Sequence, residues 1–451
     1  MINNFKGKKV LVIGLARSGL SAIVMLHKLN ADITLTELKD ISELKEADFL
    51  KELGVKYMPQ NDETFNRDWD LVIKNPGVSP VSDIVKTLKK RNIPVITEIE
   101  LAYQVSKPQH IVAITGSNGK TTTTTIVYEL LRKAFKEKAH VGGNIGTPLC
   151  ELVLEHNLME NEGHYISLEI SNAQLVDIKS FKPEVSTIVN LSPDHIDFMG
   201  GLDKYYESKV RIYENQNKED LFILNNDDET LKQYISKFEV KAKTNTFSLF
   251  DTNTNSFIKD DYIYVNNEKV LPLNLIHVVG VHNLQNIIIS CVVAKYYGIS
   301  NEDICEVIDN FTGVEHRIEF VKEVNGVKYY NDSKATNTDA TITALKAFDS
   351  NVILLVGGHD KGLDMSEVKK YLKPVKQIIG FGEAGERIAK ELDTNAKVVD
   401  NLKEAVKLAS EIAEPQDIVL LSPTTSSFDQ YSCFEERGNH FKELVNNLWN
   451  I

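Results

Sequence analysis

Residues 110–135, with the sequence HIVAITGSNGKTTTTTIVYELLRKAF, limit the possible fold more than any other stretch of the chain. An apolar, β-branched run leads into a short turn with two glycines and a lysine, and a helical pattern follows the turn. A strand that passes through such a turn into a helix is the building unit of α/β proteins. We therefore expect an α/β fold, and the lysine at the turn raises the question of what it binds.

The turn has the chemistry of a phosphate-binding loop. Backbone N–H groups and the N-terminus of the following helix would face a polyphosphate, Lys120 would reach its terminal phosphates, and Thr121 would present a hydroxyl to Mg²⁺. Two residues separate Gly116 from Gly119, whereas the common phosphate loop has four. A glycine–lysine turn alone is equally compatible with a structural role, but the flanking strand and helix favour nucleotide binding.

The alternation of strands and helices extends over most of the chain. A length of 451 residues, at roughly 150 residues per domain, indicates about three domains. The segment SLFDTNTNSFIKDDYIYVNNEKVLPL interrupts the alternation with a pattern typical of β-hairpins. We predict a Rossmann-like parallel sheet in residues 1–98, a central P-loop ATPase-like α/β domain with extra β-hairpins in 99–313, and a second Rossmann-like domain in 314–451.

A second glycine pattern, VIGLARSGLSA, follows the first predicted strand. Gly14 and Gly19 take the first and third positions of a dinucleotide-binding motif, and the acidic Glu37 lies roughly 20 residues further on. Ala16 occupies the middle position, where a glycine would let the backbone approach a pyrophosphate. The pattern favours some phosphate-bearing ligand over a purely structural turn, and NAD is the least favoured of the three interpretations.

Composition and charge exclude several classes of protein. Hydrophobic residues at 42% and charged residues at 25% are ordinary for a globular protein, and the sequence contains no apolar run near 18 residues. The N-terminus passes directly into a strand pattern, so we expect a cytoplasmic protein without membrane insertion. The formal charge of −13 with no basic block argues against nucleic acid. The four scattered cysteines are expected to be reduced.

The later motifs give the sequence a resemblance to the Mur ligases, the ATP-dependent amide-forming enzymes of peptidoglycan precursor synthesis. TGSNGKTT resembles the shortened phosphate loop of that family. Six later segments resemble further sequence blocks of the family and occur in the same order: GGNIGTPL, SLEISNAQL, NLSPDHIDFMG, YESKVRIYEN, GVHNLQN and EHRIEF. The resemblance covers essentially the whole chain. It implies three domains, ATP and Mg²⁺ as cofactors, and an acyl-phosphate intermediate.

The resemblance also assigns the ATP and metal residues. It places ATP on the loop residues and on three others further along the chain: Gly116, Ser117, Asn118, Gly119, Lys120, Thr121, Thr122, Asn286, Arg317 and Asp332. It implies two Mg²⁺ sites, with Thr121, Glu169, His195 and Lys209 as the metal-binding positions. A lysine ammonium has no lone pair for a metal, so Lys209 is expected to be carbamylated. Lys120, His195, Lys209 and Arg317 are the expected catalytic residues.

The blocks YYNDSKATNTDA and LSPTTSSFDQYSCFEERG resemble those of the family members that add D-glutamate. They imply D-glutamate and UDP-N-acetylmuramoyl-L-alanine as the substrates beside ATP. The amino-acid pocket would be lined by Thr336, Lys361, Ser427 and Phe434. The nucleotide-sugar would be bound by Arg17, Ser18, Glu37, Asn75, Gly77 and Asn144. The family often has Asp in place of Glu37 and Ser in place of Asn75, so these two assignments depart from its pattern.

Two other classes of function compete with this interpretation. A nicotinamide-dependent oxidoreductase would use GLARSG but would leave TGSNGKTT without a role. A nucleotide-binding regulator would bind ATP without amino-acid-dependent release of ADP. The expected enzyme is a monomer, and its domains are expected to close over the ligands and exclude water from the acyl phosphate.

Overall fold

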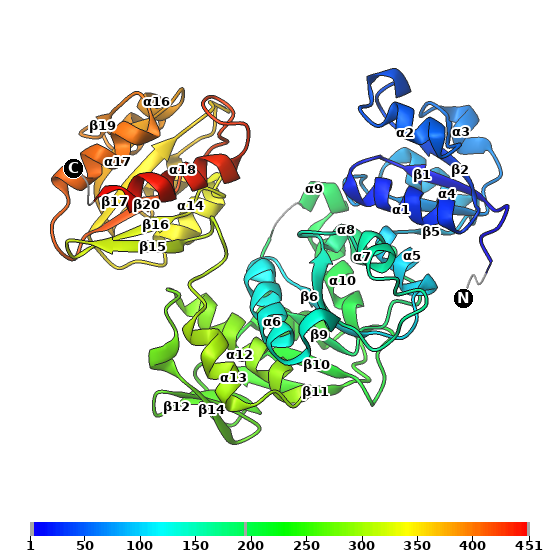
Figure 1. Cartoon of the computed structure of the whole chain (residues 1–451), viewed down its shortest axis with the longest axis horizontal. Coiled ribbons are helices and arrows are strands. Elements are labelled where there is room, and N and C mark those ends of the chain that lie inside the picture. The colour runs from blue at the N-terminus through cyan, green and yellow to red at the C-terminus, as the bar shows by residue number, and fades with distance from the viewer. Residues whose placement is uncertain (1–3, 194–195, 449–451) are drawn as a thin grey trace. The chain divides into compact units, whose positions relative to one another are not determined.

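The computed structural model describes residues 4–193 and 196–448 (Figure 1). The chain forms two compact units. The first comprises Met1–Leu275 with Gln285–Ile308, and the second comprises Ile276–Leu284 with Asp309–Ile451. Three mainly parallel sheets, two in the first unit and one in the second, confirm the predicted α/β fold. Within the described residues, no helix has the length and apolarity that a membrane crossing requires.

The N-terminal sheet is entirely parallel. Its strands in spatial order are β3 (Lys56–Tyr57), β2 (Asp32–Thr36), β1 (Lys9–Ile13), β4 (Leu71–Lys74) and β5 (Val95–Ile96). The helices that follow the strands are α1 (Arg17–Lys28), α2 (Ala47–Glu52), α3 (Asp62–Asn66), α4 (Asp83–Lys90) and α5 (Glu98–Val105). The strand order reverses at β1, and α/β sheets bind ligands at the carboxyl ends of the strands beside such a reversal.

The glycine–lysine loop connects a strand of the central sheet, β6, to the helix that follows it, α6. The strands of this sheet in spatial order are β14 (Glu268–Pro272), β13 (Tyr262–Val265), β12 (Ser256–Lys259), β11 (Lys243–Ser248), β10 (Leu221–Asn225), β9 (Val185–Ile188), β6 (His110–Thr115), β8 (Tyr165–Glu169) and β7 (Ala139–Gly143). The associated helices are α6 (Lys120–Phe135), α7 (Leu149–Glu155), α8 (Asn172–Leu175), α9 (Ile196–Met199), α10 (Leu202–Val210), α11 (Glu229–Ile235), α12 (Val281–Tyr296) and α13 (Asn301–Asp309).

The predicted β-hairpins are present in this sheet, with one difference. The pairs β12–β13 and β13–β14 are antiparallel, as expected. The strands β11 and β12 instead run parallel, with Phe247 opposite Ser256 and Ser248 opposite Phe257. Residues 249–255 connect the two strands, and at the end of β11 the Asp227 carboxylate accepts hydrogen bonds from the Ser248 hydroxyl and the Leu249 N–H.

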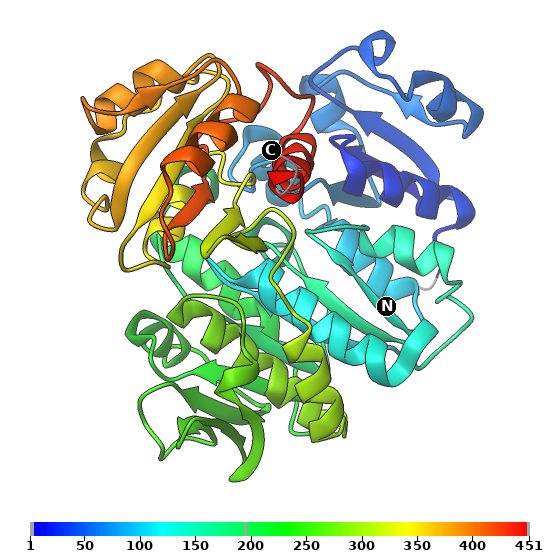
Figure 2. The ribbon, with the colours of Figure 1, turned by 60° about the vertical axis from the view of Figure 1, so that its left-hand side comes forward.

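The third sheet lies in the second unit and is covered by helices on both faces (Figure 2). Its strands in spatial order are β15 (Glu319–Val324), β16 (Val327–Asn331), β20 (Ile418–Leu421), β17 (Val352–Gly357), β18 (Val375–Phe381) and β19 (Lys397–Val398), and only β15 is antiparallel to its neighbour. The helices are α14 (Thr338–Leu345), α15 (Ser366–Lys369), α16 (Gly385–Leu392), α17 (Leu402–Ile412) and α18 (Phe434–Asn446).

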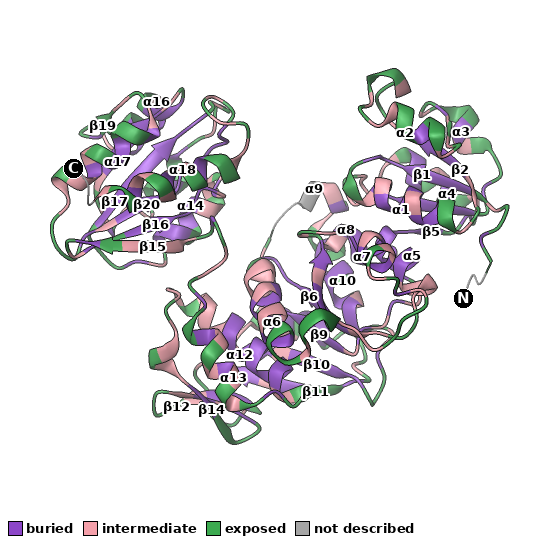
Figure 3. Ribbon diagram, in the orientation of Figure 1, coloured by how far each residue is buried: buried purple, intermediate pink, exposed green. Residues whose placement is uncertain are grey.

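Alternate side chains of the central strand β17 supply both cores of the third sheet. Leu354 and Val356 belong to the cluster with α14 and α16, whereas Ile353 and Leu355 belong to the cluster with α17 and α18. A strand buried on both faces is expected to be apolar at every position. All six residues of β17 are buried, and β4 and β9 in the other two sheets are also buried at every position (Figure 3).

Polar contacts join the N-terminal and central sheets within the first unit. The buried Glu100 of α5 accepts the backbone N–H groups of Lys179, Ser180 and Phe181, and Thr97 donates to the carbonyl of Gln174. One hydrophobic cluster includes residues of both sheets. The boundary predicted between residues 98 and 99 falls at the start of α5, and the division of the chain into three domains stays a prediction.

Candidate active site

Two glycines shape the loop between β6 and α6. Gly116 has φ +149° and Gly119 has φ +79°, conformations that favour glycine. A Cβ atom on Gly116 would lie 3.1 Å from the Cβ of Val189, and one on Gly119 would lie 2.6 Å from Oδ1 of Asn286. Gly119 is the N-cap of α6 and no side chain caps the helix, so its first N–H groups are available to an anion.

Two residues that follow the neighbouring strand β9, Asn190 and Ser192, form hydrogen bonds with this loop. The sequence analysis did not single them out. Asn190 Oδ1 accepts the N–H of Asn118 at 2.9 Å, and Asn190 Nδ2 donates to the Asn118 carbonyl at 3.1 Å. Ser117 Oγ donates to the Ser192 carbonyl at 2.7 Å and accepts the Ser192 N–H at 2.9 Å. Both partners follow β9, which pairs with β6, so adjacency of these strands is the signal that could have identified them.

The Lys120 ammonium lies over its own loop. Its Nζ donates to the carbonyls of Gly116 and Ser117, each at 2.8 Å. The loop carbonyls therefore hold the charge at the N-terminus of α6, where an anion would also bind. The role that the sequence analysis gave to Lys120 stays a prediction.

Thr121 and Glu169 meet beside the loop. Thr121 Oγ1 donates to Oε2 of Glu169 at 2.8 Å, and Asn144 Nδ2 donates to Oε1 of the same carboxylate at 2.8 Å. Glu169, at the end of β8, is 2% exposed. A hydroxyl and a carboxylate oxygen are hard ligands of the kind Mg²⁺ takes beside nucleotide phosphates, so these residues fit that ion.

Lys209 also reaches the phosphate loop, although it comes from the end of α10. Its Nζ donates to the Gly116 carbonyl at 2.9 Å and lies 4.6 Å from the centre of the Tyr205 ring. The residue is 1% exposed. The inward direction expected for this side chain is therefore correct. His195, the other expected metal ligand and catalytic residue, lies outside the described residues.

Asn286 of α12 is buried against the same loop. Its Oδ1 accepts a hydrogen bond from Thr123 Oγ1 at 3.1 Å and faces the Cα of Gly119. Ser117 is buried, Asn118 is exposed, and Thr122 is half-buried on the first turn of α6. The structure thus gathers the residues that the sequence analysis assigned to ATP in the first unit around one loop.

Five of the six residues expected to bind the nucleotide-sugar lie at the carboxyl ends of β1, β2 and β4, whereas Asn144 follows β7 in the central sheet and contacts Glu169. Glu37 accepts the N–H of Leu15 at 2.8 Å and that of Leu38 at 2.7 Å. Asn75 Oδ1 accepts the Gly77 N–H at 2.9 Å, while its buried Nδ2 has no hydrogen-bond partner among the described residues. Arg17 is exposed and Ser18 half-buried at the first turn of α1. An unsatisfied buried donor at this edge is consistent with a ligand acceptor there.

The second unit contains the remaining expected residues. Arg317 is exposed, whereas Asp332 is buried and accepts Ser422 Oγ at 2.8 Å and the Ile318 N–H at 3.3 Å. Burial raises the pKa of Asp332 to about 7, and the hydrogen bond from Ser422 opposes the shift. Lys361 Nζ donates to the Thr336 carbonyl at 3.3 Å, which brings two of the expected amino-acid contacts together.

The other two amino-acid contacts lie on neighbouring segments of the same unit. Ser427 is buried in the segment after β20, and Phe434 is half-buried at the start of α18. The ammonium of Lys334 lies 5.2 Å from the centre of the Phe434 ring. All four expected contacts thus follow or adjoin the carboxyl ends of strands in the third sheet, where α/β sheets bind ligands.

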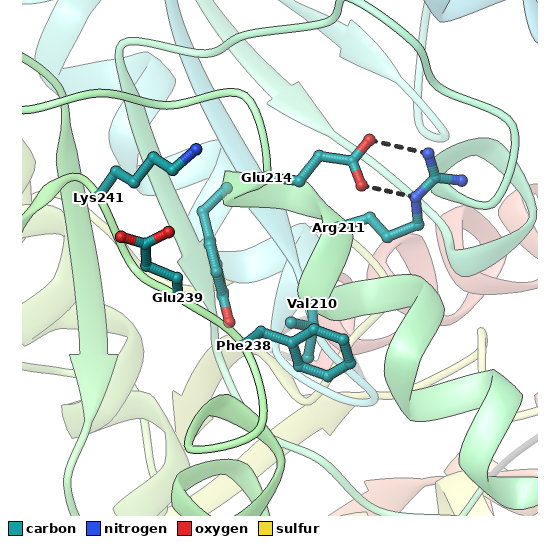
Figure 4. A pocket seen from close by; sticks show the side chains of 7 residues that line it. Val210, Arg211, Glu214, Phe238, Glu239 and Lys241 are labelled. Atoms are coloured by element: carbon teal, nitrogen blue, oxygen red, sulfur yellow. Dashed lines mark hydrogen bonds and ion pairs between the residues drawn. The ribbon is translucent and has the colours of Figure 1, made fainter.

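A pocket of about 180 Å³ lies beyond the end of α10 (Figure 4). Its lining residues are Val210, Arg211, Tyr213, Glu214, Phe238, Glu239 and Lys241. Figure 4 shows the Arg211 guanidinium turned toward the Glu214 carboxylate, with which it forms an ion pair at 2.8 Å. None of the residues predicted for the site lines this pocket, so the pocket is a feature separate from the phosphate loop.

Comparison with known proteins gives matches to two family domains and to curated relatives. Residues 114–294 match the Mur ligase middle domain, and residues 316–425 match the Mur ligase, glutamate ligase domain. The chain is 39% identical to the UDP-N-acetylmuramoylalanine–D-glutamate ligase of Geobacillus sp. (strain WCH70), with 98% of each chain covered. It is 40% identical to the enzyme of the same name from Bacillus subtilis (strain 168), with 97% of each chain covered.

Solved structures with the same fold include more distant proteins. The UDP-N-acetylmuramate-alanine ligase from Thermotoga maritima has a TM-score of 0.55 at 19% identity, with 98% of this chain and 99% of that chain covered. A pseudomurein peptide ligase type C from Methanothermus fervidus has a TM-score of 0.54 at 16% identity, with 98% and 100% covered. These likenesses concern the fold, whereas the relatives at 39% and 40% identity extend over almost the whole sequence. The chain belongs to the Mur ligase family.

Proposed function

We propose that this chain is an ATP-dependent ligase that joins D-glutamate to UDP-N-acetylmuramoyl-L-alanine in the synthesis of peptidoglycan precursors. The observation that carries the proposal is the meeting of Lys120, Thr121 and Glu169 at the open N-terminus of α6. Relatives that bear this activity in their name, at about 40% identity over nearly their whole length, support the choice of substrates.

The phosphate loop would bind and polarise ATP. Mg²⁺, when bound by Thr121 and Glu169, supplies a Lewis acid for the phosphoryl oxygens. The N–H groups at the start of α6 bind phosphate oxygens, and Lys120 stabilises the negative charge that develops on the transferring phosphoryl group. Arg317 and Asp332 are proposed to contact the nucleotide from the second unit, and Asn286 to contact its adenine.

The reaction would proceed in two steps. The alanine carboxylate of the nucleotide-sugar attacks the γ-phosphorus of ATP, the bond to the β-phosphate oxygen breaks, and an acyl phosphate and ADP form. The amine of D-glutamate then attacks the acyl carbon, phosphate leaves with the bonding electrons, and an amide forms. The proton of the amine goes to a base, for which we propose His195 or a nearby carboxylate.

We further propose a second Mg²⁺ position at His195 and a carbamylated Lys209. Carbon dioxide would add to the neutral amine with release of one proton, so the positive side chain becomes negative. The carbamate keeps an N–H for the Gly116 carbonyl, which Lys209 contacts at 2.9 Å, and gains two oxygens of the kind that Mg²⁺ prefers. Reversal of the charge also removes an unfavourable ammonium from the neighbourhood of a cation.

The other two substrates are proposed to bind to two further sets of residues. Arg17, Ser18, Glu37, Asn75, Gly77 and Asn144 would hold the nucleotide-sugar, and Thr336, Lys361, Ser427 and Phe434 would hold D-glutamate. We propose a monomer. We also propose a cytoplasmic location, where ATP and nucleotide-sugars are found.

An assay of ADP release tests the proposed function. The purified protein is given ATP, Mg²⁺ and UDP-N-acetylmuramoyl-L-alanine with each member of a panel of D- and L-amino acids. We expect ADP release that depends on both D-glutamate and the nucleotide-sugar. A different amino-acid preference would refute the substrate assignment. ATP binding without amino-acid-dependent ADP would indicate a regulator, and an absorbance change with NAD and an alcohol would indicate an oxidoreductase.

A further inference from the structure

Arg437 is a fully buried arginine on an otherwise apolar face of α18. Its residue exposure is 0%, and Phe441 and Val445, one and two turns further along the helix, are likewise 0% exposed. Burial of a charge is unfavourable unless hydrogen bonds compensate it. In the part of the chain that the structure describes, no carboxylate forms an ion pair with this guanidinium, and its hydrogen-bond partners are neutral groups. Burial lowers the pKa of Arg437, and the nearby carboxylates of Asp429 and Asp332 oppose that shift.

The partners of Arg437 belong to three separate segments. Its Nε donates to Ser333 Oγ at 3.0 Å and its Nη2 to the Ser333 carbonyl at 2.9 Å. Its Nη2 also donates to the Thr425 carbonyl at 3.1 Å, and its Nη1 to the Gly357 carbonyl at 3.4 Å. Ser333, Gly357 and Thr425 lie at the carboxyl ends of β16, β17 and β20, which are neighbours in the sheet order.

Each of these segments leads to one of the residues proposed to bind the amino acid. Thr336 follows Ser333, Lys361 follows Gly357, and Ser427 follows Thr425. The fourth proposed contact is also linked, because Ser333 Oγ donates to the Phe434 carbonyl at 2.8 Å. The planar guanidinium can bind several acceptors at fixed angles, which a lysine ammonium on its flexible stem does not reproduce.

We infer that Arg437 is the positioning residue of the amino-acid site. Its guanidinium fixes the spacing of the segments that carry Thr336, Lys361 and Ser427, and it places a permanent positive charge behind them. Both effects favour a ligand with two carboxylates. The inference rests on the proposed function, because it deepens the assignment of these residues to D-glutamate.

The alternative is that Arg437 only stabilises the fold, and a matched control separates the two roles. Asp417 is a second buried charge of the same unit, 3% exposed, but it lies just before the amino end of β20. It pairs with Lys376 at 2.9 Å and accepts the Glu414 N–H at 2.9 Å. Asp417→Asn should therefore lower stability without changing the opposite, carboxyl end of the sheet.

The experiment compares full-length wild type, Arg437→Lys, Arg437→Met, Ser333→Ala and Asp417→Asn. For each, kcat, the KM values for D-glutamate and ATP, and the thermal midpoint are measured by ADP release and by calorimetry. We expect Arg437→Lys to raise the KM for D-glutamate at least tenfold, with the KM for ATP within twofold of wild type. Arg437→Met should raise it further, and Ser333→Ala severalfold. Asp417→Asn should lower the midpoint only.

Two results would overturn the positioning role. In the first, Arg437→Lys and Ser333→Ala lower the thermal midpoint as Asp417→Asn does but leave the KM for D-glutamate unchanged. In the second, the KM values for D-glutamate and ATP rise equally. If Arg437→Met does not fold, these two milder variants decide the question. Failure of the proposed function would be seen separately, because wild type itself would then show no ADP release that depends on D-glutamate.

Discussion

Lys120 is predicted to be decisive for activity and unimportant for folding. Its Nζ donates to carbonyls three and four residues away in its own loop. We expect Lys120→Ala to leave the thermal midpoint nearly unchanged but to reduce turnover about 10³-fold or more, because the charge on the transferring phosphoryl group loses a stabilising cation. Lys133→Ala is the control and should have normal activity. Lys133 lies on the last turn of the same helix, α6, and the substitution removes its ion pair with Glu306 of α13. Near-normal turnover of Lys120→Ala would contradict the assignment of the loop.

Lys361 is predicted to recognise a carboxylate of the amino acid. Lys361→Ala should raise the KM for D-glutamate far more than that for ATP, because a charge-assisted hydrogen bond contributes roughly 1.5 to 3 kcal/mol. Steady-state ADP release with each substrate varied in turn measures both values. Lys370→Ala removes an exposed ion pair with Glu367 in the same unit and should change neither. Equal increases in both KM values would place Lys361 in the ATP site instead.

The carbamate proposed on Lys209 can be tested by replacing the missing carboxylate. Lys209→Ala should lose most activity, and added formate or acetate should restore part of it by taking the place of the carbamate oxygens. Lys209→Arg should stay inactive, because it keeps the positive charge and cannot form a carbamate. The measurement is ADP release with and without the small carboxylate. A fully active arginine variant, or an unmodified amine in an active Mg²⁺ complex, would show that the carbamate is absent.

At the scale of the elements, Glu98 links folding to pH. This buried residue at the start of α5 accepts the N–H of Cys150 in the first turn of α7, and burial raises its pKa to about 7. The folded protein thus keeps a proton that the unfolded chain releases near pH 4.5. Its contribution to stability is complete below about pH 4.5 and is lost as the pH rises toward 7, by about 3 kcal/mol at most.

Glu98→Gln keeps a hydrogen-bond acceptor for Cys150 but does not titrate. The free energy of unfolding of wild type, measured in urea from pH 4.5 to 7.5, should therefore fall relative to that of Glu98→Gln as the pH rises. Burial lowers the pKa of His140 to about 4, which works in the opposite direction, but His140 is present in both proteins and cancels in the difference. A constant difference across this range would show that Glu98 is already ionised at low pH.

The elements also show which parts of the structure the sequence could predict. Strands such as Val352–Gly357 are buried on both faces, so their unbroken apolar runs are visible in the sequence. The loop from Gly116 to Lys120 is local, so its role follows from consecutive residues. Asn190 and Arg437 act on segments about 70 to 100 residues away, and nothing in their own neighbourhoods specifies those partners.

At the scale of the whole molecule, each unit has its own hydrophobic core. Leu354, fully buried in the third sheet, belongs to the core of the second unit. Leu354→Ala should destabilise that unit by about 2 to 5 kcal/mol through loss of buried surface and the cavity that remains. Calorimetry should show two transitions, of which the variant shifts only one. A single transition that shifts as a whole would mean that the units unfold together.

The crowding around the two loop glycines has a consequence for drug resistance. A Cβ atom at Gly119 would meet Asn286 at 2.6 Å, and the positive φ at both glycines disfavours every other residue type. An inhibitor that contacts only the backbone of residues 116–119 would bind a surface that the bacterium cannot change by a single substitution at either glycine. Escape would require changes elsewhere in the protein.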